Sequence, residues 1–332
     1  MNIQARERLL NVLIVVGIIV LLFVVGYPQY KESLPSKVRI GVDKSYSSLP
    51  FYVAKLDTSR DYFRIEKINP EFIDIEGDPL QGIKDGTYDV AAVPWYWLLI
   101  SPSTNGDTVK AFSSVELRSR RALDAIIVPP KSRIKRLRDL RGKRLGYLVS
   151  DEYVVNLILQ RMVDDRITDV KKIPLQPEEI ATAFTDKKVD ALYLIDPYRT
   201  LMLSVQDNEV LLQTVFANYI MSSMPYAAIV MRKDFVEKEN KLAAIRIKNA
   251  IEATIGYLSR NPEVGKRLII KINEWGSPEG FILNLKMPDY QRLSEIDLKN
   301  IENLQTELVQ RGIGTCGIKP TEFLFERTSF MR

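Results

Sequence analysis

The sequence predicts an α/β protein with two lobes, preceded by one membrane-spanning helix. Short apolar strands alternate with amphipathic helices from Lys37 onward, a pattern typical of largely parallel sheets. About 300 residues follow the first apolar segment, more than one core of ordinary size holds, so we expect two lobes. That segment has no charged residue between Arg8 and Lys31, which is unlike the rest of the chain.

The apolar segment runs from Leu9 to Tyr27. At about 1.5 Å of rise per residue it spans roughly 27 Å, close to the thickness of the hydrocarbon layer. Arg6 and Arg8 precede it, so residues 1–8 are expected in the cytoplasm and the lobes outside the cell membrane. Its length favours an uncleaved single-pass anchor at 9–27 over a cleaved signal peptide, with residues 28–36 as a stalk.

The net charge of +5 is modest, and much of it comes from residues 131–144, where eight Lys and Arg side chains face one carboxylate, Asp139. A nucleic-acid partner does not fit a chain placed outside the cell. A solvated face is the plainest interpretation, and contact with anionic lipid or with an acidic patch on a membrane partner is the alternative.

Histidine is absent, and Cys316 is the only cysteine. One cysteine cannot form an internal disulfide, so packing must stabilise the fold. The absence of histidine excludes Ser-His-Asp and Cys-His catalysis and removes the commonest transition-metal ligand. Any remaining enzyme chemistry would rest on carboxylates, Lys or Tyr. We expect a protein that is not an enzyme, with no catalytic residues, no cofactor and no metal site.

The elements of the first lobe begin with a strand at 37–42 and a Ser- and Tyr-rich loop at 43–50. The next expected elements are strands at 63–68 and 71–77, a turn at Gly86, and buried strands at 89–93 and 123–130 that end in prolines.

The second lobe is expected to open with a turn at Gly142 and a strand at 144–149, after which Ser150 caps a helix. The remaining expected elements are strands at 170–175, 189–195 and 226–232, and helices at 177–188, 241–259 and 294–311. We place lobe 1 at 37–125 and 232–332, and lobe 2 at 126–231.

Five segments carry a family resemblance: KVRIGV with LPFYVAK (37–55), IKDGTYDVAAV (83–93), DLRGKRLGYLVS (139–150), VDALYLIDPY (189–198) and YAAIVMRKDFVEKE (226–239). In this order they resemble the substrate-binding proteins of ABC importers, in the branch for sulfonates, taurine, nitrate or thiamine-precursor pyrimidines. The resemblance implies a type II periplasmic-binding-protein fold, with a hinge and a small-molecule ligand between the lobes.

The resemblance also implies an ABC permease as partner. The chain has no nucleotide-binding Gly-Lys-Ser/Thr loop, so separate subunits would hydrolyse ATP. Two alternatives stay open: a ligand-sensing domain that signals to a partner receptor, and an enzyme on the same scaffold. The lack of histidine argues against the enzyme.

Ligand contacts are expected where strands end, because helix N-termini offer free amides there. The first loop supplies Tyr46, Ser47, Ser48 and Phe51. Trp95 follows a buried strand and is the expected stacking residue, although aromatic residues are usually part of the core.

Arg118 precedes the first crossing between lobes and could hold an anionic group, although most arginines are simply solvated. Ser150 and Asp151 open a helix, Asp196 ends a strand and Tyr226 begins one. Capping or turn formation would also explain the carboxylates. As ligand contacts, Asp151 and Asp196 favour a neutral or cationic ligand, such as an aminopyrimidine or an amine.

Overall fold

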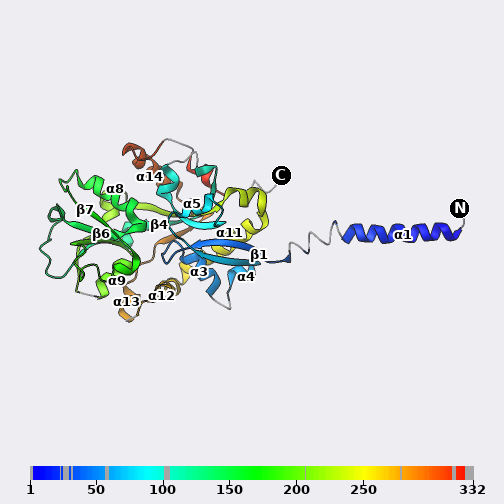
Figure 1. Cartoon of the computed structure of the whole chain (residues 1–332), viewed down its shortest axis with the longest axis horizontal. Coiled ribbons are helices and arrows are strands. Elements are labelled where there is room, and N and C mark those ends of the chain that lie inside the picture. The colour runs from blue at the N-terminus through cyan, green and yellow to red at the C-terminus, as the bar shows by residue number, and fades with distance from the viewer. Residues whose placement is uncertain are drawn as a thin grey trace.

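The computed structural model describes residues 3–22, 24, 30, 33–56, 60–100, 105–205, 207–276, 279–315 and 319–325. Parts of the predicted anchor and stalk, at 23, 25–29 and 31–32, lie outside the described residues, as does Cys316. Figure 1 shows two lobes side by side and α1 (Ile3–Leu21) standing apart from both. Within the described part of the chain, no helix combines the length and the apolar character needed to cross a membrane.

The first lobe is built on a six-stranded sheet of order β11-β4-β10-β3-β1-β2. Its strands are β1 (Ser36–Val42), β2 (Ile68–Asp74), β3 (Val90–Pro94), β4 (Val109–Arg118), β10 (Ser223–Arg232) and β11 (Asp289–Arg292). Its helices are α3 (Leu49–Leu56), α4 (Tyr62–Ile65), α5 (Pro79–Lys84), α6 (Trp95–Ile100), α11 (Lys241–Arg260), α12 (Pro262–Ile272) and α14 (Leu298–Gln310).

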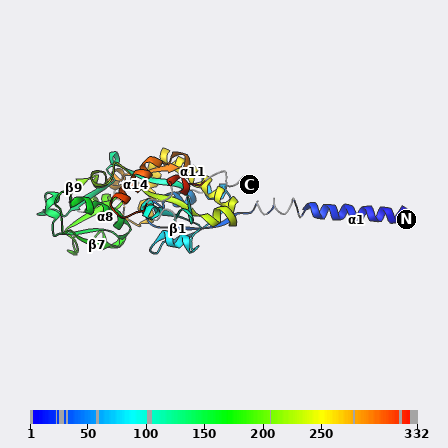
Figure 2. The same ribbon diagram turned by 90° about the horizontal axis from the view of Figure 1, so that it is seen from above.

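The second lobe is built on a five-stranded sheet of order β7-β6-β8-β5-β9. Its strands are β5 (Asp124–Val128), β6 (Arg144–Leu148), β7 (Lys171–Leu175), β8 (Ala191–Ile195) and β9 (Glu209–Gln213). Its helices are α8 (Glu152–Met162), α9 (Tyr198–Val205) and α10 (Val215–Tyr219), and α13 (Glu279–Asn284) reaches across from the first lobe to contact α9. Figure 2 shows the same two-lobed arrangement from above.

Both sheets are mixed rather than largely parallel, which differs from the prediction. In the first sheet β1 pairs in parallel with β2 and β3, while β10 runs antiparallel between β3 and β4. In the second sheet β6 is parallel to β7 and β8, while β5 is antiparallel to β8 and β9. Strands β5 and β10 directly follow the two crossings between lobes, so each enters its sheet from the opposite end, and β11 is a further antiparallel strand at the edge of the first sheet.

Three local predictions also differ from the structure. Residues 62–65 form a helical turn whose N-cap, Asp61, accepts from the amide of Arg64 at 2.9 Å, so the strand predicted at 63–68 begins only at Ile68. The helix predicted at 177–188 is a single 3-10 turn, Pro177–Glu179, followed by further turns. Ser150 lies inside a 3-10 turn and is not the N-cap of α8.

The chain crosses between lobes twice, over residues 119–123 and 214–222. The whole of β10 belongs to the first sheet, so the return crossing comes earlier than the predicted boundary at 231/232. Asp124 joins the two crossings: its carbonyl accepts from the Thr214 amide at 3.0 Å, and its carboxylate accepts from the Phe216 amide at 2.8 Å.

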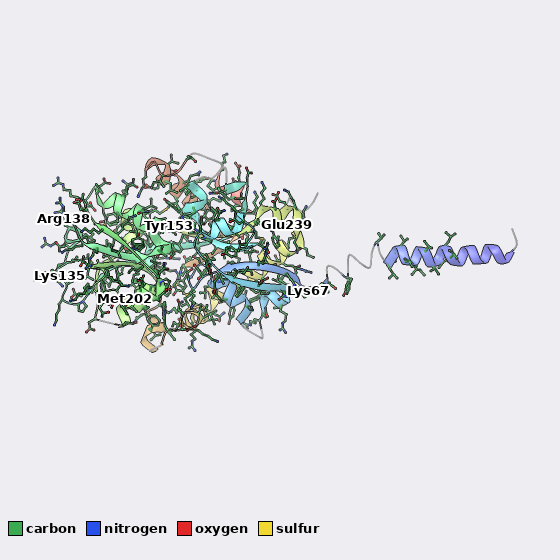
Figure 3. All side chains as sticks on the ribbon, in the orientation of Figure 1. Lys67, Lys135, Arg138, Tyr153, Met202 and Glu239 are labelled. Carbon is green, nitrogen blue, oxygen red and sulfur yellow. The ribbon has the colours of Figure 1, made fainter. Side chains whose placement is uncertain are left out.

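Two contacts hold the lobes against each other. The Tyr153 ring of α8, labelled in Figure 3, packs between Tyr96 and Tyr226 of the first lobe, with ring centroids 5.1 and 6.1 Å apart. Near the C-terminal end of the described chain, Arg311 donates to the Leu157 carbonyl in the middle of α8 at 2.7 Å. The lobes are therefore in direct contact along α8.

Candidate functional site

A cavity of about 560 Å³ lies between the two lobes. From the first lobe it is lined by residues of the loop 43–47, by Pro94 and Trp97 after β3, and by Tyr226 and Ala227 in β10. From the second lobe it is lined by residues 148–152 after β6, 176–177 after β7 and 195–198 after β8. These segments follow strand ends and open helical turns, the place where open α/β sheets bind ligands.

Six of the ten residues predicted from the sequence as ligand contacts line this cavity: Tyr46, Ser47, Ser150, Asp151, Asp196 and Tyr226. They come from both lobes and from four separate parts of the chain. The structure brings them around one cavity, and their contact with a ligand stays a prediction.

Ser48 and Phe51 lie behind the first loop rather than in the cavity wall. The Ser48 hydroxyl accepts from the Asp43 amide at 3.0 Å and so shapes the turn that presents Tyr46 and Ser47. Phe51 is fully buried in the core of the first lobe because it points inward from the first turn of α3.

Trp95 does not take the ligand-stacking position that the sequence predicted for it, and Trp97 lies at the cavity wall instead. Trp95 is fully buried, its indole N–H donates to the Ser114 hydroxyl at 2.9 Å, and its ring packs edge-on against Phe323. Trp97, two residues further along α6, is half-buried and lines the cavity. Both tryptophans follow the same strand, and the helical rotation of about 100° per residue decides which one faces inward.

Arg118 also lies away from the cavity. Its Nε is 2.7 Å from Glu116 and 2.9 Å from Asp289, and the hydrogen bond to Glu116 raises its pKa. Glu116 is itself buried and accepts from the Gln291 and Asn300 side chains. The guanidinium therefore compensates two carboxylates at the edge of the first sheet and does not point at the site.

Asp151 is the most deeply buried acid of the cavity wall, with 1% of the residue exposed. The hydroxyl of Tyr226 donates to its Oδ1 at 2.6 Å, which links the second lobe to the first. Burial raises the pKa of Asp151 to about 7, against the opposing effect of that hydrogen bond, and repulsion from Asp43 adds to the rise. The group is thus close to its protonation midpoint at neutral pH.

Asp196 is held more firmly than Asp151. Its Oδ1 accepts from the amide and the hydroxyl of Thr200 at 2.9 and 2.6 Å, and Arg199 lies 3.6 Å from its Oδ2. Burial raises its pKa to about 6 in spite of these partners. Its Oδ2, which faces Arg199, and the hydroxyl of Tyr46 are both buried and make no hydrogen bond with the described residues.

The sequence analysis did not single out four other lining residues: Asp43, Lys44, Trp97 and Tyr198. Asp43 and Lys44 begin the same loop as Tyr46, and Tyr198 directly follows Asp196 and Pro197. Their positions immediately after strands β1 and β8 were the available signal, by the same strand-end argument that selected their neighbours.

The charge of the lining is unbalanced. It contains four carboxylates (Asp43, Asp151, Glu152 and Asp196) and one cation, Lys44. Within the described residues, no three His, Cys, Asp or Glu side chains are grouped so that they could hold a metal ion. The arrangement suits an organic solute that donates hydrogen bonds or carries positive charge.

Known proteins share this architecture. A putative aliphatic sulfonates-binding protein of Escherichia coli (strain K12) is 26% identical over 221 residues, which cover 62% of this chain and 65% of that relative. The alkanesulfonate-binding protein of Xanthomonas axonopodis pv. citri bound to MOPS superposes with a TM-score of 0.66 at 16% identity, covering 88% of this chain and 99% of that one. The desulfurization enzyme DSZB superposes at 0.59 with 12% identity, covering 89% and 97%.

The family model described as NMT1/THI5 like matches residues 46–264, well over half of the chain. The match covers all of the second sheet, four of the six strands of the first sheet, both crossings and the three cavity-lining segments of the second lobe. It confirms the resemblance that the sequence motifs indicated. This chain therefore belongs to the NMT1/THI5 like family and has the two-lobed fold of periplasmic binding proteins.

Proposed function

We propose that this chain binds a small solute in the cavity between its lobes and delivers it to the permease of an ABC importer. The observation that carries the proposal is the cavity of about 560 Å³, whose lining comes from both lobes. A ligand that contacts both walls binds the closed arrangement better than an open one, so it drives closure by differential affinity. The names of the sulfonate-binding relatives support the same class of function.

We also propose that the solute is neutral or cationic rather than a sulfonate. A sulfonate would meet four carboxylates and one lysine in the lining, and no arginine stands among the described residues that form it. An amine or aminopyrimidine could instead donate hydrogen bonds to the carboxylates of Asp151 and Asp196. A charge-assisted hydrogen bond of this kind contributes about 1.5 to 3 kcal/mol.

Thermal unfolding of the full chain in a neutral detergent tests both proposals. At a ligand concentration of about 100 times Kd, we expect an amine or aminopyrimidine to raise Tm by about 5 °C, because binding stabilises only the folded state. Taurine, methanesulfonate and nitrate serve as the matched anionic set. A shift with the sulfonates alone would contradict the ligand class, and no shift with any solute would contradict the binding function. Chemical change of a bound solute would instead indicate an enzyme.

We further propose that residues 9–27 anchor the lobes to the outer face of a membrane. Large apolar side chains from Val12 to Leu22 stand on α1 with about half or more of their surface exposed, and no other described segment covers them. Exposed apolar surface of this extent marks an interaction with lipid or with another apolar partner. Arg6 and Arg8 at its start fit a cytoplasmic N-terminus.

Washing membranes from expressing cells at alkaline pH tests the anchor. The full chain is expected to stay with the membrane pellet, because transfer of the apolar segment to water is unfavourable. The matched control is the chain with Leu13, Val16 and Ile19 changed to Lys, which should be released into the supernatant. Release of both chains would refute anchoring through this segment.

A further inference from the structure

One end of the second lobe carries an excess of positive charge outside the solute cavity. We call this the distal basic surface and define it by five exposed side chains that make no ion pair with any described carboxylate: Lys131, Arg133, Arg138, Lys143 and Lys187. They lie on the loop between β5 and β6 and on the turn before β8.

Three acidic groups nearby are already occupied by other partners. Glu209 lies 2.7 Å from Lys135, Asp190 is 2.9 Å from Arg144, and the carboxylate of Asp139 accepts from the amides of Lys135 and Arg136. Internal pairing therefore leaves the positive charge of the distal basic surface uncompensated.

A hollow of about 340 Å³ opens in the middle of this surface. Its floor is apolar and buried, formed by Ile134, Phe184 and Val189. Its rim carries three cations, Arg133, Lys143 and Lys187, beside the ion pair of Arg144 with Asp190. An apolar floor inside a cationic rim is complementary to an apolar side chain flanked by carboxylates.

Part of the rim is preorganised. The Arg144 guanidinium is fixed by Asp190, at 2.9 and 3.1 Å, and by the Lys187 carbonyl at 2.7 Å. A partner would therefore meet a rim that needs little ordering on binding, which lowers the entropic cost of association.

The position of the surface argues for a protein partner rather than lipid. Figure 3 labels Lys135 and Arg138 at the end of the body opposite Lys67, beside which the chain arrives from α1. A bilayer that held α1 would lie at the Lys67 end. The distal basic surface would then face away from the lipid of that membrane.

We propose that the distal basic surface binds an acidic segment of a partner protein, with one apolar side chain of that segment inserted into the hollow. The surface is separate from the solute cavity, so the proposal does not depend on solute binding, and its choice of a protein over lipid rests on the proposed membrane anchor. Charge complementarity would set the rate of association and the apolar side chain its lifetime.

A fluorescent peptide of about ten residues, glutamates around one central phenylalanine, tests the proposal by anisotropy with the full chain in neutral detergent. At about 50 mM salt we expect saturable binding that weakens as salt is raised. The double variant Arg133→Glu/Lys143→Glu should lower the affinity at least about tenfold. The matched control Lys67→Glu/Lys241→Glu makes the same change in net charge at the other lobe and should bind like the parent.

Two further probes separate the alternatives. A peptide with the central phenylalanine replaced by serine should bind at least about tenfold more weakly, because it lacks the inserted side chain. Equal binding of both peptides would overturn the insertion and leave a simple polyanion surface. Equal losses in the two double variants, no binding at low salt, or binding of phosphatidylserine vesicles without binding of the peptide would overturn the proposal as a whole.

Discussion

Asp151→Asn is expected to raise the free energy of unfolding of the ligand-free protein by up to about 4 kcal/mol at pH 8. Burial raises the pKa of Asp151 from 3.8 to about 7, so its ionised form is disfavoured in the fold. Between these two pH values the unfolded chain has released a proton that the folded protein keeps, and stability therefore falls as pH rises. Asparagine carries no charge and can still accept the Tyr226 hydroxyl.

The pH dependence distinguishes this effect from a simple change in packing. At pH 5 the advantage of the variant should shrink to about 2 kcal/mol, because Asp151 is then protonated in the folded parent. Urea unfolding of both proteins at the two pH values measures it. Asp124 and Asp196, whose pKa values burial also raises, are present in both proteins, and their contributions cancel in the comparison.

Glu152→Gln is the matched control, because Glu152 is the next residue and also lines the cavity but has about half of its side chain exposed. Its pair with Lys172 at 3.1 Å is a surface ion pair, so a change below about 1 kcal/mol is expected at either pH. Asp151→Asn should also weaken binding of a cationic solute by about tenfold or more. Equal stability of parent and variant at pH 8 would contradict the argument from burial.

Trp95→Ala is expected to lower the free energy of unfolding by about 3 to 5 kcal/mol. The side chain is fully buried and packs against Phe323 at a ring-centroid distance of 6.5 Å. Its N–H donates a hydrogen bond to the Ser114 hydroxyl. Truncation leaves a large void and an unpartnered buried hydroxyl. Urea unfolding of parent and variant measures the loss.

Trp97→Ala distinguishes the effect of a core residue from that of a cavity residue. Trp97 belongs to the same short helix as Trp95 and is half-buried at the cavity wall. We expect it to lower stability less than Trp95→Ala does and to weaken solute binding more, measured at a temperature where both variants are folded. The reverse ranking would return Trp95 to the role that the sequence suggested for it.

The sequence predicted most of the helices, strands and turns, because these follow from the periodicity of apolar residues and the positions of glycines. Strand β1, the turns at Gly86 and Gly142 and the helix α11 lie close to where the pattern placed them, and both glycines have positive φ. The site residues that follow a strand directly, such as Asp151 and Asp196, were found by the same argument, because strand ends converge in an α/β sheet.

The other outcomes depend on contacts between distant parts of the chain. Arg118 looked available because nothing near it in sequence reveals Asp289, which reaches it only when β11 pairs with β4. Trp95 and Trp97 differ by two residues in one helix, and only the position of Phe323 from the far end of the chain shows which one is buried. Tertiary partners of this kind leave no local pattern.

The two crossings have one more consequence. Arg118 and Ser223 are paired neighbours on adjacent antiparallel strands, and the Ser119 amide donates to the Ser222 carbonyl at 2.9 Å. The chain therefore leaves the first sheet at the end of β4 and returns to it at the start of β10, directly beside that end. In an ordinary hairpin, a tight turn would join these two strand ends. The intervening hundred or so residues thus form a self-contained cassette. Recombination at the point where β4 meets β10 could transfer the second lobe, with its wall of the cavity, to a related protein. The strand order of that protein's first sheet would stay unchanged.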